Sequence, residues 1–236
     1  MRRYRTRQRR AQQITRLKIG PREIEALVST ADASKILIGQ QEWAAEKRRR
    51  TRVARHAIQR YLQSPNQRHR KAALDAVESC SLSESSEGCL STVLSLIEFA
   101  PPEIFWPALM NEWCRCDATW DHGQRLLQAL MNQTKPALPF FSSSQRQLFD
   151  ALPPQVQVFR GCSAPRACAI AWTMDRAIAE GFARGHRGIP VPEPVVASAF
   201  IAKEHIFFIT DERQEREVIL NPRRLRQVVV EPLAEC

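Results

Sequence analysis

The spacing of the apolar residues changes at Pro153 and Pro154, and this change limits the possible folds more than any other feature. Before the two prolines, apolar residues recur every three or four positions, as they do in amphipathic helices. After them, Val, Ile and Phe alternate with polar residues or form short runs, which is typical of strands. Helices followed by strands predict an α+β fold.

The predicted helices lie mainly before residue 153. The longest is expected between Asp32 and Leu62, with Ser64 and Pro65 ending it, and it carries one strongly basic face. Ser142 to Ser144 are expected to cap the last helix before the prolines. The other helices are predicted from Pro21, from Pro65 through Val77, and around 89–97, 104–113 and 126–130.

The predicted strands occupy the last third of the chain. They are rich in Val, Ile and Phe, and one helix, at 176–184, interrupts them. The strands are expected at 156–162, 195–201, 205–210, 217–220 and 227–231.

Charge divides the chain unevenly. Residues 1–72 hold 20 Lys and Arg against 5 Asp and Glu, whereas residues 73–236 hold 15 against 20. We therefore expect residues 1–80 to form a basic helical accessory region, joined to the rest by a Ser- and Glu-rich linker at 81–88. Its partner would be nucleic acid or another acidic surface, with a solvated helix face as the alternative.

Composition limits the cellular setting and the cofactors. No apolar run is long enough to cross a membrane, and the basic N-terminus lacks the apolar stretch of a secretory signal. Seven irregularly spaced cysteines favour a reduced, cytoplasmic protein, with delivery into another cell left open. Cys114, Cys116 and His122 do not have zinc spacing, so we expect a helix with one buried and one exposed thiol, and no metal.

Three short motifs in the last third carry the chemistry. They are Phe159-Arg160-Gly161, Ala171-Trp172-Thr173 and Glu215-Arg216-Glu217. In this order and spacing, the stretch from about 143 to 223 resembles the mono-ADP-ribosyltransferase family, in particular its bacterial and phage members. The resemblance implies an enzyme that cleaves the nicotinamide bond of NAD and transfers ADP-ribose to a protein or nucleic acid, with NAD as its substrate and no metal.

The resemblance also implies an architecture. Residues 89–236 would form the transferase-like domain, a split β-sandwich with a helical part at 89–152 and a strand-rich, NAD-binding part at 153–236. Residues 1–80 would remain outside it as the accessory region.

The two glutamates would do the catalytic work. In a strand, Glu215 and Glu217 would point to the same face and present paired carboxylates. Loss of nicotinamide leaves an oxocarbenium-like ribose, which a fixed carboxylate stabilises. By resemblance this role belongs to Glu217, and Glu215 would orient or deprotonate the acceptor, which the family associates with arginine. The alternative is a pair of solvated charges on an edge strand.

The remaining site residues follow from the same resemblance. Arg160 would pair with the NAD pyrophosphate, and Gly161 would let the backbone approach the ligand closely. Phe208 and Asp211 would lie in the loop that contacts the acceptor. For Arg160 alone, a surface arginine after a strand is the alternative.

The middle motif departs from the family at one position. Relatives read Ser-Trp-Thr, and this chain keeps Trp172 and Thr173, followed by Phe182, but has Ala171 where the family has the serine that holds the catalytic glutamate. Loss of one such hydrogen bond costs about 0.5–1.5 kcal/mol. By resemblance, Trp172, Thr173 and Phe182 would belong to the NAD-binding site, and Thr173 is one candidate to replace the missing serine. Simple core packing is the alternative for Trp172 and Phe182.

Two rival functions remain open. In one, the transferase site has decayed at Ala171 and the chain is a non-catalytic nucleic-acid-binding or structural protein. In the other, the same site uses water as acceptor and the chain is an NAD glycohydrolase.

Overall fold

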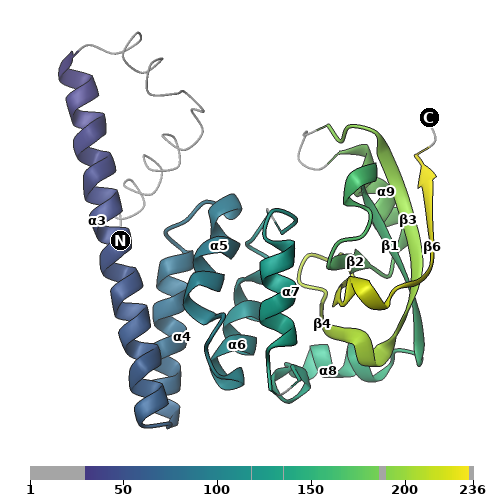
Figure 1. The fold of residues 1–236 in the computed structure, drawn as a ribbon, viewed down its shortest axis with the longest axis horizontal. Coiled ribbons are helices and arrows are strands. Elements are labelled where there is room, and N and C mark those ends of the chain that lie inside the picture. Colours follow the sequence, from purple (N-terminus) through teal and green to yellow (C-terminus); the bar gives the residue numbers. More distant parts are fainter. Residues whose placement is uncertain (1–29, 118, 135, 186–189, 234–236) are drawn as a thin grey trace.

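The computed structural model describes residues 30–117, 119–134, 136–185 and 190–233, and side chains from residue 40 onward. The basic tail and the helix expected from Pro21 lie outside the described residues. Helices come first and an antiparallel sheet follows, so the predicted α+β class is confirmed (Figure 1).

The helices stack from one end of the molecule toward the sheet. The long helix α3 lies at the outer end, alongside α4, and α5, α6 and α7 follow in order (Figure 1). None of the described helices has the length and apolar character needed to span a membrane. The helices are α3 (Thr30–Gln63), α4 (Gln67–Ser81), α5 (Ser86–Ile97), α6 (Pro102–Trp113), α7 (Gly123–Met131), α8 (Ser143–Asp150) and α9 (Arg176–Arg184).

Half of the stretch predicted as a linker is helical, and it joins helices that pack together, so the prediction of a linker between separate regions is wrong. Helix α4 ends at Ser81 and α5 begins at Ser86, with Ser85 capping it. Ser81 is fully buried, and its hydroxyl donates a hydrogen bond to the carboxylate of Glu112 in α6. One cluster of buried side chains continues from Ala54 in α3 to α7, so the helices on both sides of the predicted linker share a core.

Two cysteines in this helical region form a disulfide. Cys89 at the start of α5 is bonded to Cys116 just after α6, with their Cα atoms 5.1 Å apart. The expectation of unpaired thiols at Cys114 and Cys116 is therefore wrong for Cys116, whereas Cys114 has a free, partly buried thiol. Proximity after folding, not sequence spacing, pairs these two cysteines.

Six antiparallel strands pair in the order β4-β5-β2-β1-β3-β6. The described strands form one open sheet, where the split sandwich had implied two. The predicted strands are all present, and the middle motif adds a short one. The strands are β1 (Gln155–Ser163), β2 (Ala171–Thr173), β3 (Pro194–Ala202), β4 (Ile206–Thr210), β5 (Glu217–Leu220) and β6 (Arg226–Pro232).

The two faces of the sheet have different neighbours. One face packs Val158, Trp172 and Val218 into a core that α8 covers with its apolar residues. On the other face, α9 packs against β1, while Phe208 and Ile219 join the core of the helical region. Between α9 and α6, this second face carries Thr173 and Glu217, which are paired across β2 and β5.

Candidate active site

Glu217, the first residue of β5, is the centre of the candidate site. Its carboxylate is partly buried, and its Oε2 accepts a hydrogen bond from the indole Nε1 of Trp113 at 2.8 Å. Trp113 is the last residue of α6, and its ring packs edge-on against Phe208 of β4 with centroids 5.4 Å apart. The helical region thus holds the carboxylate in place.

The carboxyl group of Glu217 titrates near neutral pH. Burial raises its pKa from 4.5 to about 7, and the charge of Glu215 acts in the same direction. The hydrogen bond from Trp113 and the charges of Arg213 and Arg160 partly oppose this rise. A carboxyl group with such a pKa can accept and release a proton at physiological pH, as general acid–base chemistry requires.

Glu215 does not share a strand with Glu217, contrary to our prediction. The strand begins at Glu217, and Arg216 has a left-handed backbone with φ of 46°. Strand alternation therefore does not set the direction of Glu215. Its backbone carbonyl instead accepts a hydrogen bond from the Thr173 hydroxyl at 2.6 Å, which ties the segment before β5 to β2.

Thr173 thus supports the backbone that leads into Glu217. Its hydroxyl donates to Glu215 and accepts from the backbone NH of Asp175 at 3.0 Å. As a replacement for the family serine, Thr173 was expected to donate a hydrogen bond to the carboxylate of Glu217. Its hydroxyl donates to the backbone carbonyl of Glu215 instead. Ala171 lies two residues earlier, on the same face of β2 as Thr173 and Glu217, so a serine in that position would face the correct side of the sheet.

Arg160 lies on the opposite face of the sheet from Glu217. Its neighbour Phe159 pairs with Thr173, so alternation directs Arg160 toward the core face that holds Val158. Its Nε and Nη1 donate hydrogen bonds to the carbonyls of Arg166 and Ala171 at 3.0 and 2.5 Å. Burial lowers the pKa of the guanidinium, while the nearby Cys162 and Glu217 raise it.

Gly161 serves the packing of a helix. A Cβ atom at this position would lie 1.6 Å from the carbonyl oxygen of Ala179 and 2.7 Å from the backbone nitrogen of Ala183, both in α9. The close approach that glycine permits in this structure is therefore to α9, whereas the approach to a ligand stays a prediction.

Two aromatic residues of the predicted site lie in different environments. Trp172 is buried in the core on the opposite face from Glu217, and its indole donates to the carbonyl of Ala169 at 2.8 Å. Phe182 is partly exposed on α9. Core packing, the alternative considered for Trp172, is what the structure shows for it.

The two residues predicted for the acceptor loop, Phe208 and Asp211, lie in different environments. Phe208 is fully buried against Trp113, so it does not face a loop or a cavity, and this prediction was wrong. Asp211 is exposed and follows β4 directly. Its Oδ1 accepts a hydrogen bond from the backbone NH of Arg216 at 3.0 Å, which fixes the turn between β4 and β5.

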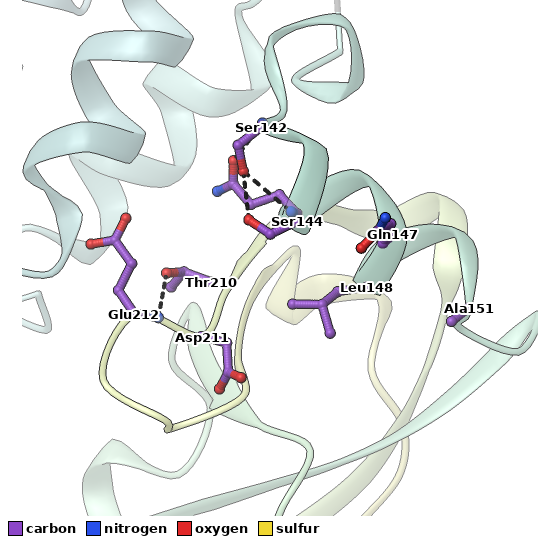
Figure 2. A pocket seen from close by; sticks show the side chains of 9 residues that line it. Ser142, Ser144, Gln147, Leu148, Ala151, Thr210, Asp211 and Glu212 are labelled. Atoms are coloured by element: carbon purple, nitrogen blue, oxygen red, sulfur yellow. Dashed lines mark hydrogen bonds between the residues drawn. The ribbon is translucent and has the colours of Figure 1, made fainter.

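An open cavity of about 530 Å³ lies between α8 and the β4–β5 turn (Figure 2). Hydroxyl and amide groups from α8 face it from one side, and the carboxylates of Asp211 and Glu212 extend from the turn on the other. Thr210, which lines the cavity, pairs with Glu217 in the sheet. The cavity therefore lies beside the candidate site and does not include Glu217 itself.

Metal ligands are not grouped in the described residues. No cluster of three or more His, Cys, Asp or Glu side chains suited to a metal ion occurs among them.

Trp113 is the site residue that the sequence did not reveal. Its apolar spacing predicted a core position in a helix, and the residue is indeed 2% exposed. Its indole NH reaches a carboxylate 104 positions later in the chain. A buried tryptophan usually has a hydrogen-bond partner for its indole NH. This requirement was the one sequence signal that Trp113 contacts a polar group.

Comparison with known proteins yields no relative. No family model, no curated protein and no solved structure matches this chain. The candidate site therefore stands on its own geometry and on the motifs themselves.

Proposed function

We propose that this chain is a mono-ADP-ribosyltransferase that cleaves NAD and transfers ADP-ribose to a macromolecular acceptor. The observation that carries the proposal is the position of the three motifs on adjacent strands. Phe159 of β1 pairs with Thr173 of β2, and Thr173 pairs with Glu217 of β5. Three motifs that are far apart in the sequence thus form one row across the middle of the sheet.

Glu217 has the environment that the reaction needs. In the proposed step the bond between the ribose C1′ and nicotinamide breaks, and nicotinamide leaves with the bonding electrons. Ionised Glu217 stabilises the positive charge that develops on the ribose. The acceptor nucleophile then forms its bond to C1′, and its proton passes to Glu215 or to water.

The present arrangement of Arg160 limits how NAD can bind. Two of its nitrogen atoms already bond to backbone carbonyls, and its side chain lies on the face opposite Glu217. Arg160 therefore supports β2 and the connection that precedes it in this conformation. A pyrophosphate contact requires Nη2 or a change of rotamer.

The cavity beside Thr210 suits the acceptor. It adjoins Glu217 through the β4–β5 pairing, and Asp211 and Glu212 give it two carboxylates. A cationic acceptor group such as a guanidinium would be attracted to them. This agrees with the family association between a Glu-x-Glu pair and arginine acceptors.

The test is the release of nicotinamide from NAD by the full chain, with Glu217→Gln as the inactive variant. Glu204→Gln removes an exposed carboxylate (79% exposed side chain) and is the matched control. We expect release by the wild type and the control, and loss of at least 100-fold in Glu217→Gln. Wild-type protein that releases no nicotinamide, with cell lysate present as a source of acceptor, contradicts the proposal.

Two further experiments distinguish the proposed transferase from an NAD glycohydrolase and from a decayed site. Label from ³²P-NAD that becomes attached to a macromolecule indicates transfer, whereas free ADP-ribose indicates a glycohydrolase. The variant Ala171→Ser restores the family residue on the same face of the sheet as Glu217. An inactive wild type with an active Ala171→Ser variant would identify a decayed site.

A further inference from the structure

Among the residues that the structure describes, the outward face of α3 is a row of arginines without carboxylate partners. From Lys47 to Leu74 the chain contains no Asp or Glu. Arg48, Arg52 and Arg55 are exposed, and within the described part of the chain no carboxylate pairs with any of them. Their spacing of four and three residues places them in one stripe along the helix.

The inward cations of the same helix behave differently. Lys47 forms an ion pair with Glu84 at 2.8 Å, and Arg50 bonds to Glu46 and to the carbonyl of Ser79. These contacts attach α3 to α4 and to the turn that follows α4. These inward charges are therefore paired, whereas the outward stripe has no carboxylate partner in the part of the chain that the structure describes.

The described helices and strands leave the stripe accessible. Helix α3 forms the outer end of the molecule, and its far side has no described element against it (Figure 1). Ala54, Ile58 and Tyr61 bury the inner side against α4. At 1.5 Å per residue, Arg48 and Arg55 are about 10 Å apart along the helix, close to the width of about 12 Å of the major groove of DNA.

We propose that the arginine face of α3, formed by Arg48, Arg52 and Arg55, binds the phosphate backbone of double-stranded DNA. This proposal is independent of the proposed transferase activity. Unpaired strands are usually held by stacking on aromatic rings, and no Phe, Trp or Tyr occurs between Arg48 and Gln59. The major groove of duplex RNA is deep and narrow, so the spacing of about 10 Å from Arg48 to Arg55 fits the wider groove of DNA better.

The experiment measures binding of the full chain to a fluorescent random-sequence DNA duplex of about 20 base pairs by anisotropy. The titration is repeated from 50 to 200 mM salt. The test variant is Arg48→Gln/Arg52→Gln/Arg55→Gln. The control variant, Arg223→Gln/Arg224→Gln/Arg226→Gln, removes the same charge from exposed positions beside the sheet. Both variants keep the basic N-terminus.

We expect the α3 variant to bind at least 10-fold more weakly than the wild type at low salt. Each lost phosphate contact should reduce the slope of log K against log salt by about 0.9, so the slope should fall by about 2 to 3. The control should retain most of its affinity and slope. Replacement of the same three arginines with lysine should preserve both, because phosphate attraction needs only the charge.

Three results would overturn the proposal. The first is equal loss of binding in the α3 variant and the control, which would show that DNA binding depends on net charge and not on the position of the arginines. The second is equal or tighter binding of a single strand or an RNA duplex in competition. The third is equal competition by polyglutamate, which would identify an acidic protein surface as the partner. Circular dichroism and thermal unfolding verify that each variant is folded.

Discussion

The indole of Trp113 and the carboxylate of Glu217 join the helical region to the sheet through one hydrogen bond of 2.8 Å. The bond connects the last residue of α6 to the first residue of β5. It lowers the pKa of Glu217, while burial raises it to about 7. The proton affinity of the candidate catalytic group thus depends on how α6 packs against the sheet.

Removal of the indole should raise the pKa of Glu217. In Trp113→Phe the ring remains but the donor is lost, so we expect a pKa above 7. The measurement is a titration of ¹³C-labelled glutamate carboxyl groups by NMR, with Glu217→Gln to assign the signal. Trp106→Phe, which shortens another buried tryptophan of the same helix, should leave this pKa unchanged. An unchanged pKa in Trp113→Phe would contradict the assigned contact.

Folding stability should depend on pH through Glu217. Because its folded-state pKa is raised from 4.5 to about 7, the group stabilises the fold below pH 4.5, and this contribution is lost as the pH rises to about 7. Glu217→Gln should therefore raise the free energy of unfolding at pH 8 by about 1–3 kcal/mol, with a smaller gain at pH 5. Urea unfolding at both pH values measures this, and Glu204→Gln is the control. A gain that is equal at both pH values would show that the pKa is not raised.

Catalysis, if Glu217 acts as proposed, should increase as the pH rises through 7. The carboxylate form stabilises the ribose cation, and about half of the molecules carry it at pH 7. The rate of nicotinamide release should rise with an apparent pKa near 7 and level off above pH 8. In Trp113→Phe the midpoint should move to higher pH. A rate that is constant from pH 5 to 9 would exclude Glu217 as the group that controls it.

Two glycines near α9 should respond in opposite ways to alanine. Gly161→Ala places a methyl group against the backbone of Ala179, so α9 must move and we expect a loss of at least 3 kcal/mol. A methyl group on Gly181, inside α9, would point into open space, so Gly181→Ala should stabilise by about 0.5–1 kcal/mol. Thermal unfolding of the two variants checks both signs. Equal stability of Gly161→Ala and the wild type would rule out the close contact with α9.

Arg160 should stabilise the fold even when no ligand is bound. Its two hydrogen bonds hold the carbonyls of Arg166 and Ala171, and bonds from charged groups each contribute about 1.5–3 kcal/mol. Arg160→Gln should lower the free energy of unfolding in the absence of NAD by about 2–4 kcal/mol. Arg223→Gln, at an exposed position, should change it by less than about 0.5 kcal/mol. A stable Arg160→Gln variant that loses only NAD binding would favour the role implied by the resemblance.

The local elements could be predicted because their signals are local. Ser142 caps α8, and its hydroxyl and the Gln145 side chain form the reciprocal bonds of a capping box. Asp175 caps α9, which has the predicted bounds Arg176–Arg184. The strand Glu217–Leu220 also agrees with the prediction, since short Val- and Ile-rich runs favour strands in any context.

The errors arose where a residue's role depends on distant partners. The linker prediction failed because Ser81 finds a buried carboxylate 31 positions later, and Phe208 was misplaced because α6 covers it. The alternation expected for Glu215 and Glu217 failed because a left-handed residue at 216 ends the strand between them. Neither composition nor local periodicity reveals contacts between residues that are far apart in the chain.

The sequence by itself determined the helices, the strands, the basic face of α3 and the order of the three motifs, since each rests on periodicity or charge along the chain. The tertiary structure alone decided that β1, β2 and β5 are neighbours, that Arg160 faces away from Glu217, and that Trp113 binds the carboxylate. The physical reason is that strand order and burial are set by packing over the whole chain. Burial then sets the pKa of Glu217.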